Sequence, residues 1–273
     1  MLLQRTLTAL LLAPLVILVL LLPPGWTWLF ALVAVAAFLA GLWEWTRLSG
    51  LRNRPVRAGL LGVALAVFAL LWWLRDTIQW PVLATGVAWW VLACVWLKNF
   101  AFAAAPTTEN RNLKLAAGAL VVFPAFVGLL AIHASEPYGH WWTLLTLLIV
   151  WAADIGAYFS GRFLGKRKLA PNISPGKTWA GVYGAFVAGA LVAVVGGVLL
   201  GVAGWRLLAL ALLAVLTVAA SVVGDLIESL MKRHAQVKDS GRMFPGHGGL
   251  LDRMDSVFAA VPVFALGKLL LGL

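Results

Sequence analysis

Long apolar segments, separated by short polar connections, make up most of this chain. Taking apolar runs long enough to cross ~30 Å of hydrocarbon as helices, we predict spans near 7–23, 26–46, 58–74, 81–97, 115–133, 141–161, 179–203, 205–230 and 255–272. The chain is 63% hydrophobic and only 11% charged, which excludes a soluble globular domain, whose apolar share is nearer half. The pattern therefore predicts an all-α, polytopic membrane protein with about nine transmembrane helices.

The basic residues alternate with the predicted spans. If the N-terminus is cytoplasmic, all 21 Lys and Arg fall on the inner side except Arg75, Arg206 and Lys268. A bias of this kind sets the orientation of a membrane protein, so we expect the loops at 162–178 and 232–253 to face the cytoplasm. Basic loops also contact anionic lipid, so the net charge of +11 does not by itself indicate a substrate.

Polar residues are unevenly divided between the two halves of the chain. We interpret residues 1–273 as a single integral membrane domain, with 1–140 mainly scaffold helices and 141–273 carrying the catalytic helices and cytoplasmic loops. The acids of the first half lie near span ends or in loops: Glu44, Asp76, Glu109 and Glu136. We therefore expect Glu44→Gln to be nearly silent.

Two pairs of carboxylates, each three residues apart, lie at the inner ends of the last two spans. Asp225 and Glu228 share one helix face, and Asp252 and Asp255 open the final span. An acid within a span is costly unless it is paired, hydrated or bound to a metal. Carboxylate oxygens suit Mg²⁺, which binds through one or two carboxylates plus substrate phosphates. An interhelical ion pair with Lys or Arg remains the alternative.

A glycine-rich turn, Pro245-Gly246-His247-Gly248-Gly249, lies between these two pairs. Glycines let backbone N–H groups approach a phosphate, and a following helix N-terminus favours an anion. A turn of this kind before a membrane helix often has no ligand. Its position between the carboxylate pairs favours a phosphate-binding role here.

The connection after the sixth predicted span ends in Ser174-Pro175-Gly176-Lys177-Thr178. It imitates the end of a P-loop, but that motif needs Gly where Pro171 stands, and we expect no preceding strand. A lysine at a helix start can still hold phosphates by the same helix-terminus chemistry. Asp154, inside the sixth span, either lines the same cavity or pairs with a loop cation.

The C-terminal motifs resemble those of a known family. Ser229-x-Met231-Lys232-Arg233, Lys238-Asp239-x-Gly241 and Phe244-Pro245-x-His247-Gly248-Gly249-Leu250-x-Asp252-Arg253-Met254-Asp255 match the full signature of the phosphatidate cytidylyltransferases (CDP-diacylglycerol synthases). Ser174-Pro175-Gly176-Lys177-Thr178-Trp179 is similar to the bacterial form. The resemblance covers residues 150–255.

This resemblance implies that CTP and phosphatidate give CDP-diacylglycerol and pyrophosphate, at the cytoplasmic face of a bacterial plasma (inner) membrane. It implies one or two Mg²⁺ ions, with a monovalent cation left open, on Asp225 and Asp252, with Glu228 and Asp255 as further candidates. The implied catalytic residues are Asp225, Asp252, Lys177, Lys232, Arg233, Lys238 and Arg253. The implied binding residues are Ser174, Lys177, Thr178, Asp239, His247, Gly248 and Gly249. The expected partners are membrane lipid and the two substrates, without nucleic acid, and a homodimer is left open.

The lipid phosphate is itself the nucleophile in such a reaction, so positioning and charge neutralisation suffice, and His247 is not needed as a general base. Three alternatives remain open. They are a CTP-dependent lipid-alcohol kinase, a cytidylyltransferase for another lipid acid, and a transporter that uses Asp154 and Asp225 as a cation relay. The lack of an internal repeat disfavours the transporter.

Overall fold

The computed structural model describes residues 14–243 and 248–273. Its elements are η1 (Pro24–Trp26), α2 (Thr27–Leu48), α3 (Arg54–Lys98), α4 (Thr108–His133), α5 (Gly139–Leu164), β1 (Lys168–Ala170), β2 (Ser174–Thr178), α6 (Trp179–Leu199), α7 (Trp205–His234) and α8 (Leu251–Leu271). Residues 14–20 are also helical. The prediction of an all-α membrane protein is confirmed, with one short hairpin added.

Within the described residues, seven helices are long and apolar enough to cross a membrane, so the predicted number of nine is wrong. Two of the predicted spans, 58–74 and 81–97, form the single 45-residue helix α3. Another, 7–23, falls partly outside the described residues, which begin at residue 14, and its described part is helical over 14–20. The polar residues Arg75 and Asp76 were interpreted as a loop, but polarity alone does not interrupt helical hydrogen bonding.

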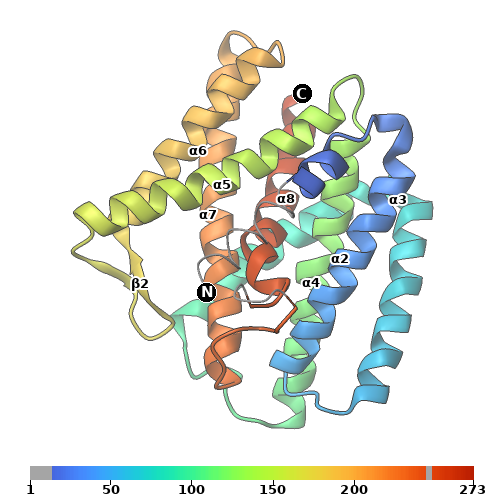
Figure 1. Ribbon diagram of the computed structural model, residues 1–273, viewed down its shortest axis with the longest axis vertical. Coiled ribbons are helices and arrows are strands. Elements are labelled where there is room, and N and C mark those ends of the chain that lie inside the picture. Colours follow the sequence, from blue (N-terminus) through green and yellow to red (C-terminus); the bar gives the residue numbers. More distant parts are fainter. Residues whose placement is uncertain (1–13, 244–247) are drawn as a thin grey trace.

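The two arms of α3 nevertheless run in opposite directions. Figure 1 shows the light-blue first arm upright and the teal second arm running back behind α4. Near its start, Arg57 Nε donates to Thr46 Oγ1 at the end of α2 (2.9 Å). Just beyond its end, the carbonyl of Phe100 lies 2.7 Å from Nε2 of His234, the last residue of α7. Pro81 lies inside this helix, and proline is a usual cause of a sharp bend.

Helices α4 and α8 form the centre of the molecule. Phe126, Phe258 and Phe264 are fully buried there. In Figure 1, α2, α3 and α4 lie on one side of α8 and α6 and α7 lie on the other, while α5 crosses near the upper end of α8 from one side to the other. Large apolar side chains remain exposed on the outer helices, for example Trp73 and Leu199, as expected of surfaces that face lipid rather than water.

Helices α5 and α6 pack through small residues. A Cβ added to Gly156 would lie 2.6 Å from the carbonyl oxygen of Gly184, so the two backbones nearly touch. Small residues are typical where membrane helices approach closely. The antiparallel hairpin β1–β2, in which Lys168 pairs with Thr178, joins these helices at one end. The expectation that no strand precedes Lys177 was therefore wrong, although the missing glycine still excludes a P-loop.

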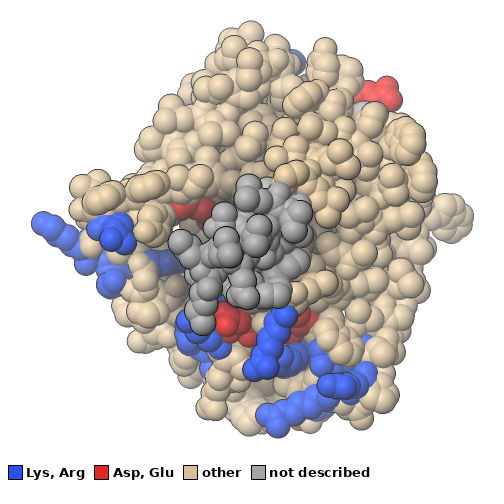
Figure 2. Space-filling view, viewed as in Figure 1, with Lys and Arg blue, Asp and Glu red and all other residues tan. Residues whose placement is uncertain are grey.

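Lysines and arginines gather in the lower half of the face shown in Figure 2, while its upper half is almost entirely uncharged. The ends of α2 and α7 and the starts of α4 and α8 meet at the charged end. Trp45 Nε1, for example, donates to the carbonyl of Lys114 at the start of α4 (2.7 Å). The acids at the ends of the last two helices therefore lie in the most charged part of the molecule.

Candidate active site

The hairpin places Lys177 over an acid of α7. Thr178 caps the start of α6, its hydroxyl accepting from the amide of Gly181 (3.1 Å), which fixes the end of β2. Lys177 Nζ then lies 2.5 Å from Asp225 Oδ2, and each side chain is about a quarter exposed. The other Asp225 oxygen accepts from Ser229 Oγ (3.2 Å). A partly exposed ion pair of this kind can exchange its partner for a ligand.

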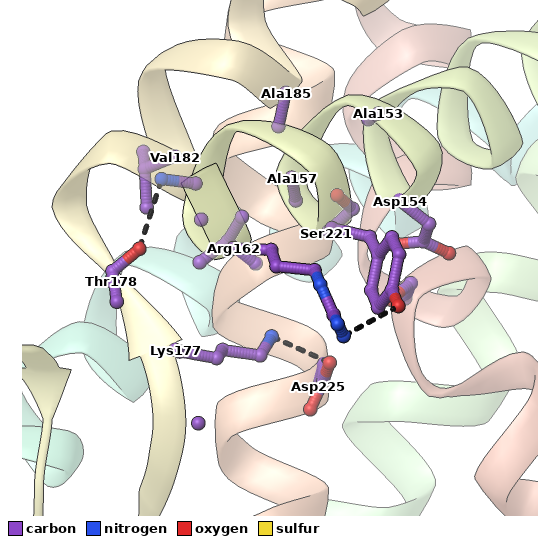
Figure 3. A pocket seen from close by; sticks show the side chains of 16 residues that line it. Ala153, Asp154, Ala157, Arg162, Lys177, Thr178, Val182, Ala185, Ser221 and Asp225 are labelled. Carbon is purple, nitrogen blue, oxygen red and sulfur yellow. Dashed lines mark hydrogen bonds and ion pairs between the residues drawn. The ribbon is translucent and has the colours of Figure 1, made fainter. Parts of the chain in front are cut away.

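This ion pair opens into a cavity of about 400 Å³. Helix α5 contributes Asp154, Tyr158 and Arg162 to its wall. Figure 3 shows Asp154 and Arg162 on the same cavity as Lys177 and Asp225. Arg162 Nη1 donates to the hydroxyl of Tyr158 (3.3 Å). Asp154 therefore lines the same cavity as the signature residues, the first of the two alternatives that the sequence left open.

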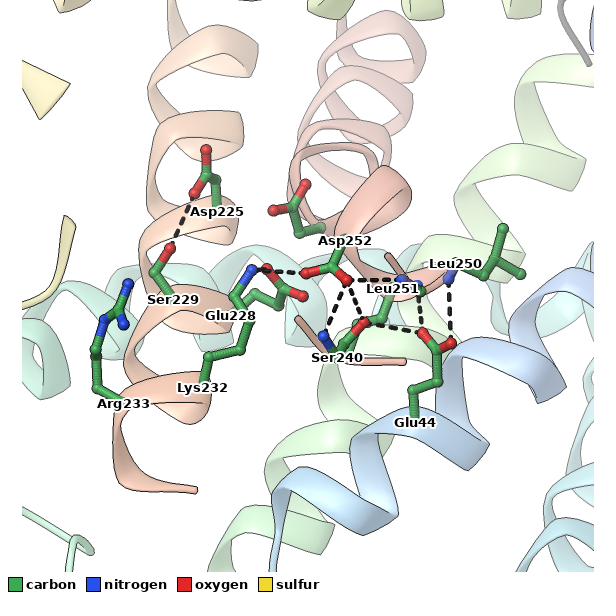
Figure 4. Close-up of polar contacts among 12 residues, drawn as sticks. Glu44, Asp225, Glu228, Ser229, Lys232, Arg233, Ser240, Leu250, Leu251 and Asp252 are labelled. Atoms are coloured by element: carbon green, nitrogen blue, oxygen red, sulfur yellow. Dashed lines mark hydrogen bonds and ion pairs between the residues drawn. The ribbon is translucent and has the colours of Figure 1, made fainter. Parts of the chain in front are cut away.

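Two turns beyond Asp225 on α7, Lys232 joins the two helices that carry the acids. Its Nζ lies 2.5 Å from Glu228 Oε2 and 2.7 Å from Asp252 Oδ1 of α8. Glu228 is almost completely buried, so this ammonium offsets a charge that water does not reach. Figure 4 shows Lys232 pointing up between the two carboxylates. This bridge is the interhelical ion pair that the sequence left open as an alternative, and it brings acids of the last two helices side by side.

The second oxygen of Asp252 organises the segment that precedes α8. Asp252 Oδ2 accepts from the amide of Ser240 (2.9 Å), from Ser240 Oγ (2.8 Å) and from the amide of Gly249 (2.8 Å). Gly248 adopts a positive φ of +81° there, and a Cβ on it would lie 2.7 Å from the same oxygen. Only glycine fits such a position without strain.

Glu44, at the end of α2, belongs to the same cluster. Its Oε1 accepts from the amide of Leu250 (3.2 Å), its Oε2 accepts from the amide of Leu251 (2.8 Å), and Ser240 Oγ lies 3.0 Å away. A Cβ on Gly249 would overlap this carboxylate. Interpreting Glu44 as part of an inert scaffold was therefore wrong. A glutamate four residues before the end of the apolar helix α2 was the available signal.

These carboxylates also change the role of the glycine-rich turn. The amides of Gly249, Leu250 and Leu251, at the start of α8, already point at Asp252 and Glu44 (Figure 4). The predicted phosphate role of Gly248 and Gly249 is not supported in this arrangement, because protein carboxylates take the place of the anion. His247 and the rest of 244–247 lie outside the described residues.

The remaining predicted residues are spread around this centre. Arg233 Nε donates to the carbonyl of Ile173 in the hairpin turn (3.2 Å), which ties the hairpin to α7. Ser174 pairs with Ala170 across the hairpin and does not line the cavity in the part of the chain that is described. Three others are exposed at the charged end, Lys238, Asp239 and Arg253.

Asp255 lies beside Asp225 through backbone packing. A Cβ on Gly224, the residue before Asp225, would overlap the carbonyl oxygen of Asp255. Asp255 Oδ1 accepts from the amide of Ser256 (2.6 Å). The close approach of α7 and α8 therefore depends on glycine at 224.

Among the described residues no three acids, histidines or cysteines converge as a ready-made metal site. Asp225 fits a hard cation best, because it is partly exposed to the cavity and one neutralising group, Lys177, holds it. Glu228 Oε1 is buried without a hydrogen-bond partner in the described chain. Asp252 has both oxygens engaged, so it fits a cation only after Lys232 moves away.

A family model described as "Cytidylyltransferase family" matches residues 3–270. The chain belongs to the cytidylyltransferase family. It is 43% identical over 265 residues to a phosphatidate cytidylyltransferase of Pseudomonas aeruginosa, covering 97% of this chain and 96% of that protein. The protein of that name from Haemophilus influenzae is 37% identical over 284 residues, covering 97% and 98% of the two chains. The one from Brucella suis is 34% identical over 243 residues, covering 87% and 83%.

Family membership confirms the resemblance that the C-terminal signature indicated, and with it the prediction of an enzyme. The signature residues now have distinct places. Lys177 and Asp225 line the open cavity, whereas Lys232, Asp252, Gly248 and Gly249 hold α7, α8 and the segment between them together.

Replacing Glu44 should loosen this segment. In Glu44→Gln, a single amide oxygen cannot serve the donors that now reach two carboxylate oxygens, and the new NH₂ faces a backbone N–H. Leaving buried donors unpaired costs about 1–3 kcal/mol each. We expect a lower melting temperature in detergent and faster trypsin cleavage after the exposed Lys238 or Arg242. Glu136→Gln, in the exposed α4–α5 connection, is the matched control, and equal cleavage of the two variants would contradict this role of Glu44.

Proposed function

We propose that this enzyme transfers the cytidylyl group of CTP to phosphatidate, giving CDP-diacylglycerol and pyrophosphate. The proposal is supported by relatives of that name that match nearly the whole chain. The observation that carries it is the Lys177–Asp225 pair, which faces an open cavity next to the buried Lys232 bridge. Cations and acids of this kind suit a reaction between two phosphates.

In this reaction an oxygen of the phosphatidate phosphate bonds to the α-phosphorus of CTP. The bond between the α-phosphorus and the bridging oxygen breaks, and pyrophosphate leaves with the electron pair. Phosphatidate already offers an anionic oxygen, so the protein needs no side-chain nucleophile. Its task is to bring two anions together and to stabilise the charge on the leaving group.

We assign the triphosphate of CTP to the cavity between α5, α6 and α7. Lys177 and Arg162 provide positive charge on its wall, and a volume of about 400 Å³ lies within the usual range for ligand pockets. Arg233 keeps the hairpin that carries Lys177 in place. Lys238 and Arg253, exposed at the same end, would neutralise the parts of the substrates that extend from the cavity.

Mg²⁺, when bound, would stabilise charge on phosphate oxygens. Asp225 would hold it, with Asp252 joining once Lys232 turns to a substrate phosphate; Glu228 and Asp255 are the nearest further carboxylates. Lys232 and Lys177 each neutralise an acid in this structure. Their ammonium groups are therefore available to phosphates whenever another cation takes over the carboxylates.

We also propose that the site faces the cytoplasm of a bacterium, with the protein in its plasma (inner) membrane. The support is the charge bias of the sequence, since CTP is a cytoplasmic nucleotide. In a Cys94→Ser background, Glu136→Cys should react with an impermeant maleimide in intact cells. Asn172→Cys, in the hairpin turn, should react only in inverted vesicles. Labelling of Asn172→Cys in intact cells would reverse the orientation.

The activity is tested in mixed micelles with CTP, phosphatidate and Mg²⁺. The lipid product should contain cytidine, and pyrophosphate should be released in equal amount. A lipid kinase would instead transfer phosphate and leave cytidine out of the lipid. If another lipid acid reacted with CTP and phosphatidate did not, that lipid acid and not phosphatidate would be the substrate.

Asp225→Asn should lower turnover at least ~10²-fold, the effect of removing one electrostatic contact to the transition state. The variant keeps the volume of the side chain, so the melting temperature should change little. Asp76→Asn is the control, because Asp76 is 87% exposed at the far bend of α3. Full activity of Asp225→Asn at saturating Mg²⁺ would remove Asp225 from the mechanism.

Lys177→Ala should raise the CTP concentration that gives half-maximal rate. The phosphatidate mole fraction that gives half-maximal rate should rise less. A lost charge-assisted contact is worth about 1.5–3 kcal/mol, so we expect a shift of roughly 10- to 100-fold. Lys168→Ala provides the control, since Lys168 is exposed on the other strand of the same hairpin. A shift confined to phosphatidate would place Lys177 on the lipid side.

A further inference from the structure

A second cavity, of about 770 Å³, lies where α2 ends and α3 begins. Its wall is completed by the segment 240–243, which precedes the glycine-rich turn. Four arginines line it, and we call it the arginine cavity: Arg47, Arg54, Arg57 and Arg242. None of these positions was a candidate site residue in the sequence.

The positive charge of the arginine cavity is not balanced within the described part of the chain. None of its arginines forms an ion pair there. Among the described residues, Glu44 is the only carboxylate on the wall, and its oxygens are engaged by Ser240 and by the amides that start α8. Several guanidinium groups around one cavity repel one another, so an anion bound there would relieve the repulsion.

One of these arginines is held in place before any ligand arrives. Arg57 is 6% exposed, and its guanidinium stacks 3.7 Å from the ring centre of Trp43. Its Nη2 donates to the carbonyl of Trp43 (2.5 Å) and its Nε to Thr46 Oγ1. A basic residue that only sets the orientation of a membrane protein does not need its guanidinium group held in one position. A preorganised guanidinium is typical of phosphate recognition.

The other part of the cavity wall is apolar. Leu39, Ala40 and Leu61 line it, and the adjacent face of α3 exposes Leu60 and Val63. In Figure 2, Lys and Arg side chains gather near the lower end of α2 and the start of α3, directly below an uncharged surface. A ligand that meets both parts must carry an anionic group at one end and hydrocarbon at the other.

The arginine cavity is connected to the candidate active site through Ser240. Ser240 Oγ lies 3.0 Å from Glu44 Oε2 and 2.8 Å from Asp252 Oδ2. Ser240 also lines the arginine cavity. A ligand in that cavity therefore lies one residue away from the acid that Lys232 bridges.

We infer that the arginine cavity receives the phosphate headgroup of phosphatidate from the bilayer, with the acyl chains along the apolar face of α2 and α3. The inference rests on the proposed function for the identity of the lipid. A phosphomonoester carries up to two negative charges and suits several guanidinium groups better than a phosphodiester does. Lys177 and the cavity between α5, α6 and α7 are then left for CTP.

The test uses Arg54→Gln/Arg242→Gln, two exposed positions whose change spares the buried Arg57. Arg52→Gln is the matched control, because Arg52 is exposed in the same α2–α3 connection and does not line the cavity. Binding of radiolabelled phosphatidate to the purified full chain in micelles is measured by co-elution. We expect binding to weaken roughly 10-fold in the double variant and less than 2-fold in Arg52→Gln.

Kinetics supply the second measurement. The double variant should raise the phosphatidate mole fraction for half-maximal rate about as much as it weakens binding, and should leave the CTP requirement within about 2-fold. Equal effects of Arg52→Gln and the double variant would show that binding depends on the positive charge of the surface in general and not on this cavity. That result would overturn the inference. Unchanged binding in the double variant would overturn it as well.

Competitors identify the ligand. Phosphatidylglycerol, a phosphodiester lipid, and inorganic phosphate should each displace phosphatidate poorly at equal concentration. Displacement by phosphatidylglycerol as effective as by unlabelled phosphatidate would show a site for any anionic lipid, and displacement by inorganic phosphate would show a site for free phosphate. Either result contradicts the inference. If the wild type made no CDP-diacylglycerol, the proposed function would fail, while the binding measurements would still decide whether the cavity holds this lipid.

Discussion

The ammonium group of Lys232 holds together the part of the molecule on which the site depends. It lies between Glu228 of α7 and Asp252 of α8, two acids that cannot both be buried beside each other without a compensating charge. Asp252 can then use its second oxygen for Ser240 and Gly249. The bridge thus aligns two helices and also the loop between them.

Two cavities lie on opposite sides of this bridge, and their walls differ in kind. The cavity beside Asp225 is lined by both acids and bases, among them Asp154, Arg162 and Lys177. The arginine cavity has basic residues facing an apolar wall. A soluble polyphosphate and a membrane lipid make such different demands on a protein, and one binding surface could hardly meet both.

The sequence predicted the chemistry of the site better than its contacts. The sequence placed the acids of the last two helices at neighbouring ends, because residues three apart on a helix share a face and consecutive helices tend to be neighbours. It also left an interhelical ion pair open as an alternative, and Lys232 forms such a pair with Asp252. The role of Glu44 could not be predicted in this way, since its partners Leu250 and Leu251 offer backbone amides that carry no signal in the sequence. The helix count was wrong for a related reason: hydropathy marks where a chain leaves hydrocarbon, but not whether its hydrogen bonding continues there.

The continuous helix α3 has a consequence for what the protein exposes on the two sides of the membrane. A chain that turns back through a loop must leave several backbone N–H and C=O groups for water to solvate. In α3 the chain stays helical around the turn, although Pro81 has no N–H to donate, and Arg75 donates to the carbonyl of Trp72 and pairs with Asp76. The turn therefore adds very little polar surface on the far side. The charged and irregular segments of the chain gather instead around the two cavities, so the protein has one chemically active face and one that serves chiefly to end its helices.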